Sequence, residues 1–222
     1  MQSATTAPRR RTQSERSAAT RAQLLEAAID CLVTYGYAGT TTTRVAERAG
    51  VSRGAQLHHY PTRAELVAAA AEHLFASLTA EYRSAFEALQ GEVSLAAAIE
   101  LLWSMFDRPS FGAVIELYTA ARTDADLRDC LEPVSASHTA NVDRLAARYF
   151  PALAIDASRL KAVLSLVTNA MHGMVAERLV DGRNPAGERE QLVLLEEAVT
   201  ALIGVGAPAM PTASETTTGE RS

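Results

Sequence analysis

Apolar residues recur along most of this chain at the spacing of an amphipathic helix. In residues 20–34, an apolar stripe runs from Leu24 to Leu32, and Gly36 follows where a helix of that length would end. No segment shows the two-residue alternation that is typical of strands. The pattern therefore predicts an all-α protein, with helices over residues 20–34, 42–49, 53–60, 93–107, 109–122, 124–149, 156–181 and 186–204 and a long helix from residue 63 past residue 78.

The two ends of the chain lack this periodicity. Residues 1–19 are rich in Thr, Ser, Gln and Arg, which predicts a flexible basic arm. Residues 206–222 are rich in Thr, Ser and Glu, which predicts a disordered tail.

Composition narrows the cellular setting. Cys31 and Cys130 are the two cysteines, too few for a disulfide framework, and each lies on an apolar stripe as a buried thiol would. The Arg-rich start has no apolar run of a secretory signal, and no uncharged stretch has the length of a membrane-spanning helix. We therefore expect a soluble cytoplasmic protein without a membrane partner.

Charge is distributed unevenly. The net charge is −5, yet residues 1–63 carry nine arginines against four acids, a net of +5, while the remainder carries −10. A basic segment attached to an acidic body is typical of a module that meets a polyanion.

Residues 41–60 have the layout of a helix-turn-helix. Thr41 can cap a first short helix, Gly50 permits a sharp turn, and Ser52 can cap a second short helix. In such motifs the second helix enters the major groove of DNA, and Arg53 in its first turn is the strongest candidate for reading a guanine.

Residues 24–66 also resemble the DNA-binding half of the TetR family of bacterial transcriptional regulators. The resemblance is carried by GYAGTT at 36–41, VAERAGVSRGA at 45–55 and HHYPTRAEL at 58–66. It implies an N-terminal three-helix helix-turn-helix domain over residues 20–66, followed over residues 67–205 by a larger helical domain that binds ligand and dimerises.

The resemblance also implies roles for individual positions. Where the family has Leu and then Tyr, this chain has Gln56 and then Leu57, which exchanges the polarity of the two sites and leaves open which one faces DNA. Candidates for base contact are Thr43, Arg53, Gly54, Gln56 and Leu57. Candidates for contact with the DNA backbone are Thr41, Thr42, Ser52, His58, His59, Tyr60 and Arg63.

Some of these positions have plainer interpretations. His58 and His59 point about 100° apart on a helix and lack a partner four residues away, so they predict helix packing or phosphate contact and no metal site. Tyr60 is better suited to a position in the core than to one that faces DNA.

Bulky apolar residues in the body suggest a ligand pocket with a few polar anchors, although a packed core explains the same pattern. The candidate pocket residues are Leu102, Trp103, Phe106, Phe111, Tyr118, Asn169, His172 and Met174. Glu116 and Arg122 are further candidate anchors, and surface positions would suit them equally. No sequence motif predicts a cofactor.

The last two predicted helices are apolar on more than one side. Such helices need burial on more than one side, either in a thick monomer core or between subunits. In the family these helices pair across a two-fold axis as a four-helix bundle. The candidate interface residues are Val163, Leu164, Val167, Met171, Leu192, Leu195 and Val199.

The sequence thus predicts a homodimeric regulator, most simply a repressor, that a small-molecule effector releases from a palindromic DNA operator. Two alternatives remain from other classes. One is a helical scaffold that has lost sequence-specific DNA binding, and the other is an α-helical enzyme fused to a DNA-binding head. The enzyme is disfavoured because the chain lacks HExxH, GxSxG, GxxxxGK[ST] and dinucleotide-binding patterns.

Overall fold

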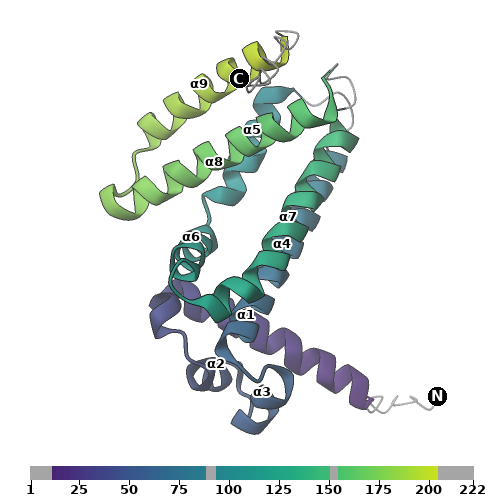
Figure 1. The fold of residues 1–222 in the computed structure, drawn as a ribbon, viewed down its shortest axis with the longest axis vertical. Coiled ribbons are helices and arrows are strands. Elements are labelled where there is room, and N and C mark those ends of the chain that lie inside the picture. Colours follow the sequence, from purple (N-terminus) through teal and green to yellow (C-terminus); the bar gives the residue numbers. More distant parts are fainter. Residues whose placement is uncertain (1–11, 89–93, 151–154, 205–222) are drawn as a thin grey trace, which may run out of the picture.

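A computed structural model describes residues 12–88, 94–150 and 155–204, and these residues form nine helices and no strand. Figure 1 shows the N-terminal helices at one end of an elongated molecule and the C-terminal helices at the other. Within the described ranges, no helix has the length and apolar character needed to cross a membrane. The helices are α1 (Gln13–Gly39), α2 (Thr42–Ala49), α3 (Arg53–His59), α4 (Arg63–Ala88), α5 (Leu95–Phe106), α6 (Pro109–Ala121), α7 (Ala125–Tyr149), α8 (Ala157–Asp181) and α9 (Pro185–Gly204).

The all-α prediction is confirmed, and helices α5 to α9 begin and end within two residues of the predicted positions. Local signals fix these ends: Ser94, Asp124 and Asp156 each accept a hydrogen bond from a backbone N–H of the helix that they cap, and Pro109 stands in the first turn of α6.

The start of α1 was predicted too late. Thr12 and Glu15 form a reciprocal capping box, so the helix begins at Gln13 and residues 13–19 are helical rather than part of a flexible arm. Residues 1–11 and the predicted tail at 206–222 lie outside the described residues. The predicted division between residues 66 and 67 falls inside the continuous helix α4.

Helix α4 connects the head to the body. Its first turns place Leu66 in a core shared with α1 and α2, and Val67 in a second core shared with α1, α6 and α7. Further along, Phe75 and Leu78 belong to a third core formed with α5, α6, α8 and α9. The head therefore shares a rigid element with both deeper cores.

Gly36 kinks α1 three residues before its end. Its backbone lies at φ 65° and ψ −179°, a region that in practice only glycine occupies. The space on its far side is filled by α6, because a Cβ at this position would lie 2.5 Å from Oε1 of Glu116. The turn after the kink ends at Thr40, whose buried hydroxyl donates to the carbonyl of Gly36 at 2.7 Å.

The substitution Gly36→Ala should therefore destabilise the fold by about 2 kcal/mol or more. The backbone conformation of Gly36 is strained for a residue with a side chain, and the added methyl group would clash with the Glu116 carboxylate. Gly173→Ala is the matched control. Gly173 lies inside α8, and no neighbouring element comes within 4 Å of the position that an added Cβ would occupy. Because alanine is a better helix former than glycine, this change should raise stability by about 0.5–1 kcal/mol. Urea unfolding of the two variants checks the contrast, and equal stabilities would contradict it.

Candidate DNA interface and internal cavity

Helices α2 and α3 form the predicted helix-turn-helix. The hydroxyl of Thr41 accepts from the backbone N–H of Arg44, and that of Ser52 accepts from the N–H of Ala55, each at 3.2 Å. Between the helices Gly50 takes a left-handed conformation, φ 67° and ψ 28°, which turns the chain sharply. Each capping hydroxyl still has its own proton free to donate to a phosphate oxygen.

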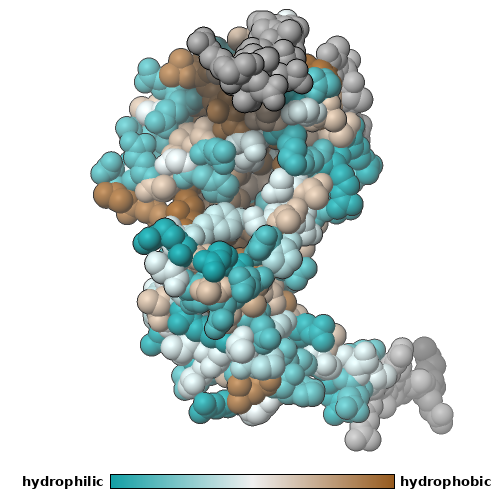
Figure 2. Space-filling view, in the orientation of Figure 1, coloured by the Kyte–Doolittle hydropathy of each residue, from teal (hydrophilic) through white to brown (hydrophobic). Residues whose placement is uncertain are grey.

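The outer face of α3 presents one cation, one apolar side chain and one imidazole. Arg53, Leu57 and His58 are exposed, and Gly54 lies between them without a side chain. An apolar spot is visible over α3 at the lower end of the head in Figure 2. On α2, Thr41 and Thr43 are exposed and Thr42 is half-buried. Most of the candidate contact residues are thus exposed on the outside of α2 and α3 or at the start of these helices.

Gln56 does not belong to that surface. Its side chain is fully buried, and Nε2 donates to the carbonyl of Tyr60 at 2.7 Å across the end of α3. The carbonyl needs a side-chain partner because Tyr60 caps the end of α3 and no further turn of that helix follows. The exchange of polarity at Gln56 and Leu57 therefore has a structural reason, and Gln56 is removed from the base-contact candidates.

Arg63 is also engaged inside the protein. Its guanidinium lies 3.8 Å from the centre of the Tyr37 ring and donates to the Tyr37 carbonyl. The Tyr37 hydroxyl in turn donates to Asp124 at 2.7 Å. Burial and this hydrogen bond raise the pKa of Tyr37 to about 12, while the N–H of Leu127 and the Tyr37 hydroxyl lower the pKa of Asp124. Arg63 therefore joins α4 to the end of α1 and the start of α7 and has little reach left for a phosphate.

Glu116 completes this junction from α6. Its Oε1 accepts from the backbone N–H of Tyr37 at 2.5 Å, immediately after the kink at Gly36. Sequence reasoning treated Glu116 as a candidate pocket anchor, but it points to the DNA-binding head. Glu116 and Gly36 are far apart in the sequence, and no motif in a single sequence indicates that they lie close together.

A cavity of about 270 Å³ lies in the body between α4, α5, α6, α7 and α8. Phe106 and Phe111 stack on each other with ring centres 4.2 Å apart, and the edge of His172 meets Phe106. The predicted pocket residues that line it are Leu102, Phe106, Phe111, Tyr118, Asn169 and His172.

A second histidine, missed by the sequence reasoning, lines the same cavity. His138 on α7 stacks on Phe75 of α4 with ring centres 4.1 Å apart. Burial, and to a lesser extent His172, lower the pKa of His138 to about 4, and burial lowers the pKa of His172. Both imidazoles are therefore uncharged at neutral pH.

Comparisons with known proteins find relatives both of the N-terminal head and of nearly the whole chain. Residues 24–70 match the family described as bacterial regulatory proteins, tetR family. An uncharacterized HTH-type transcriptional regulator of Mycobacterium tuberculosis is 32% identical over 193 residues, covering 86% of this chain and 98% of the relative. The HTH-type transcriptional regulator CymR of Pseudomonas putida is 30% identical and covers 86% of this chain and 95% of CymR.

The chain belongs to the TetR family. It is therefore a helix-turn-helix transcriptional regulator and not an enzyme. A solved relative, the multidrug binding protein EbrR complexed with imidazole, superposes with a TM-score of 0.64 at 25% identity, covering 84% of this chain and 96% of that one.

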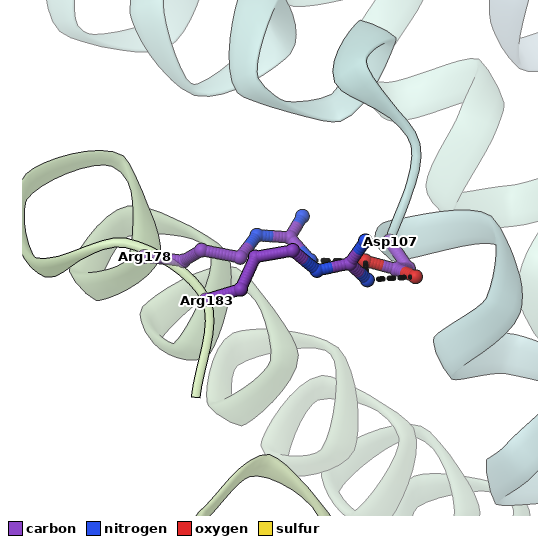
Figure 3. Close-up of polar contacts among 3 residues, drawn as sticks. All are labelled: Asp107, Arg178 and Arg183. Atoms are coloured by element: carbon purple, nitrogen blue, oxygen red, sulfur yellow. Dashed lines mark hydrogen bonds and ion pairs between the residues drawn. The ribbon is translucent and has the colours of Figure 1, made fainter. Parts of the chain in front are cut away.

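Two predicted pocket residues of this TetR-family chain lie outside the cavity lining. Met174 is buried in the core beside it, and Trp103 packs under Arg178, whose guanidinium lies 5.7 Å from the ring centre. Figure 3 shows Arg178 and Arg183 converging on Asp107, at the corner between α5 and α6. Arg178 is 12% exposed, so this ion pair is shielded from water and anchors the end of α8 to that corner.

The candidate interface residues mostly face the monomer core. Val163, Val167, Met171, Leu192 and Val199 are buried within one chain, where they pack α8 and α9 against α5 and α6. Leu164 lines the cavity, and Leu195 packs against the same core. The monomer-core interpretation therefore explains these positions. The exposed apolar side chains of the two helices are instead Leu166, Leu179, Val180, Val193 and Leu194.

The buried histidine predicts acid sensitivity. Because the folded state disfavours the proton on His138, stability is complete above the ordinary histidine pKa and falls as pH drops toward 4. This residue alone should cost about 2 kcal/mol between pH 7.5 and pH 5. Urea unfolding at the two pH values should show a smaller loss for His138→Leu than for the wild-type protein.

His73→Leu is the control for that measurement, since His73 lies outside the cavity and pairs with Glu26 at 2.7 Å. An equal loss of stability in the wild-type protein and in His138→Leu would show that His138 does not titrate as a buried group.

Proposed function

We propose that this TetR-family regulator is a homodimeric repressor, bound to a palindromic operator through α2 and α3 and released when a small molecule enters the cavity. The observation that carries the proposal is that one helix, α6, both lines the cavity, through Phe111 and Tyr118, and bonds to the head, through Glu116. Relatives support the two halves of the proposal: AcnR of Corynebacterium efficiens, 28% identical, is named a transcriptional repressor, and EbrR is named a multidrug binding protein.

The proposed DNA contacts follow from exposure and chemistry. Arg53 reads a guanine edge, Leu57 meets an apolar group such as a thymine methyl, and Gly54 lets the helix approach the bases. Thr43 reaches a neighbouring base. Backbone phosphates are met by Thr41, Thr42, Ser52 and His58, and by the half-buried His59 and Tyr60 at the edge of the surface. Gln56 and Arg63 take no part, because Gln56 is fully buried and the guanidinium of Arg63 is bound to Tyr37.

A dimer would bring two such heads onto one duplex. The half-sites read by its recognition helices must lie about 34–36 Å apart, or a multiple of that distance. The proposed interface uses the outer faces of α8 and α9. There, small and apolar residues are exposed on both helices, which permits close approach of a second copy: Ala162 and Leu166 on α8, and Val193, Leu194, Ala198 and Ala201 on α9.

Release requires the effector to favour a conformation that cannot reach both half-sites. A ligand that displaces Phe111 or Tyr118 must move α6, and α6 carries Glu116 against the kink at Gly36. Because Glu116 accepts a hydrogen bond from the backbone N–H of Tyr37, a shift of α6 is passed to the end of α1 and from there to α2. The head orientation thus depends on the occupancy of the cavity.

Fluorescence anisotropy on DNA from upstream of the protein's own gene tests DNA reading. Ligand-free protein should bind that DNA more tightly than a scrambled duplex, with two protomers on each bound site. Arg53→Ala should reduce the preference by about tenfold or more, since a bidentate guanine contact contributes about 1–3 kcal/mol. Arg83→Ala, which removes an exposed arginine from α4, should leave the preference unchanged. Wild-type behaviour of Arg53→Ala would refute the assignment of α3.

The Glu116 contact tests the release step. With a compound that releases the wild-type protein from DNA, Glu116→Ala should keep the affinity for the compound but lose most of the release, because the α6 contact to Tyr37 is gone. Coupling in such systems amounts to about 1–3 kcal/mol, so the loss is measurable as a changed ratio of DNA dissociation constants with and without compound. Glu190→Ala on the surface of α9 is the control. Full release by Glu116→Ala would rule out this route.

A further inference from the structure

The size and walls of the cavity favour a flat aromatic ligand. A cavity of about 150 Å³ is enough to hold one benzene ring, so about 270 Å³ accommodates two fused rings. Aromatic side chains approach this space from α4, α6 and α5, among them Tyr82, Phe111 and the stacked Phe106. Aromatic pairs with ring centres about 4.5–7 Å apart are favourable beyond the area that they bury, so such walls reward a planar occupant.

The charges around the cavity disfavour an anion. Among the described residues that line it, none is a lysine or arginine, and Asp143 is the one carboxylate. The single lysine of the sequence, Lys161, lies in an adjacent open groove that shares Asp143 with the cavity. An anionic group inside the cavity would lose its water without gaining a cation, which costs several kcal/mol.

Two of the polar side chains that line the cavity are the uncharged imidazoles of His138 and His172. An uncharged histidine keeps its proton on one of its two ring nitrogens. In an uncharged imidazole the other nitrogen is then a bare acceptor. His138 has no hydrogen-bond partner at Nδ1 among the described residues, although it lies in the interior. Both rings line the cavity, so a hydroxyl or amino group of an occupant can donate to the bare nitrogen of an imidazole that faces it.

We infer that the cavity selects an uncharged, planar, two-ring aromatic molecule with a hydroxyl or amino donor, which the imidazoles of His138 and His172 receive. The inference rests on the proposed role of the cavity as the effector site and specifies its ligand class. Phe75 and Phe106 hold the two imidazoles in place by ring contacts, so the acceptors are set before the ligand arrives. Asp143 and Thr139 lie at the rim, where Thr139 is exposed.

Four probes of nearly equal shape test this selection: 2-naphthol, 2-methylnaphthalene, 2-naphthoate and 2-naphthylmethylammonium. Their binding to the full-length protein is measured by titration calorimetry at pH 7.5 without DNA. We expect 2-naphthol to bind tenfold or more tightly than 2-methylnaphthalene, which lacks the donor. We expect the anion and the cation to bind at least tenfold more weakly than 2-naphthol.

Three variants assign the selection to residues. His138→Leu and His172→Leu should each bring the ratio between 2-naphthol and 2-methylnaphthalene below about threefold, while 2-methylnaphthalene still binds and so reports an intact cavity. His73→Leu makes the same substitution outside the cavity and should leave the ratio unchanged.

Several outcomes overturn the inference. If 2-naphthoate binds as tightly as 2-naphthol or more tightly, the lack of a lysine or arginine in the lining does not exclude anions. If the ammonium probe binds most tightly, Asp143 is the group that recognises the ligand. An unchanged ratio in both histidine variants would remove the imidazoles from recognition. Absence of binding by every probe would refute this ligand class, whereas DNA recognition would still stand or fall separately with the Arg53→Ala comparison.

Discussion

The continuity of α4 is the constraint on which the rest of this structure depends. At 1.5 Å per residue its 26 residues span about 39 Å, and they enter all three hydrophobic cores in turn. Packed helices resist small deformations because their side chains interlock at near-crystalline density. The head is therefore not joined to the body by a flexible linker, and its orientation depends on how the helices of the body pack.

Against this rigid helix, polar contacts define how the pieces meet. Glu116 and Arg63 both bind Tyr37 at the end of α1. Glu116 accepts from the backbone N–H of Tyr37, and Arg63 donates to its carbonyl and lies over its ring. Elsewhere in the body, Asp107 forms ion pairs with Arg178 and Arg183 at the corner between α5 and α6. Helix α6 is thus anchored at Asp107, just before its first residue, and at Glu116, near its middle. In the proposed function, a change in the cavity acts on a helix that is held at these two points.

The sequence was most informative where structure is decided locally. Caps, prolines and glycines gave the ends of α5 to α9 closely, and the helix-turn-helix pattern placed Arg53 on an exposed face. It was least informative where distant residues meet. The burial of Gln56 depends on the carbonyl of Tyr60, and the partner of Gly36 lies on another helix. On Ala-rich helices such as α8 and α9, periodicity showed apolar faces but not which of them the monomer itself would cover.

The wide rim of the cavity has a consequence for timing. Thr139, Ser165 and Asn169 all line it and are exposed, so its entrance lies on the surface between α7 and α8. Figure 1 shows these two helices diverging along their length. A compound can enter through such an opening at the pace of diffusion, without waiting for the protein to open. For the proposed effector, the lifetime of the complex is then governed by the escape rate.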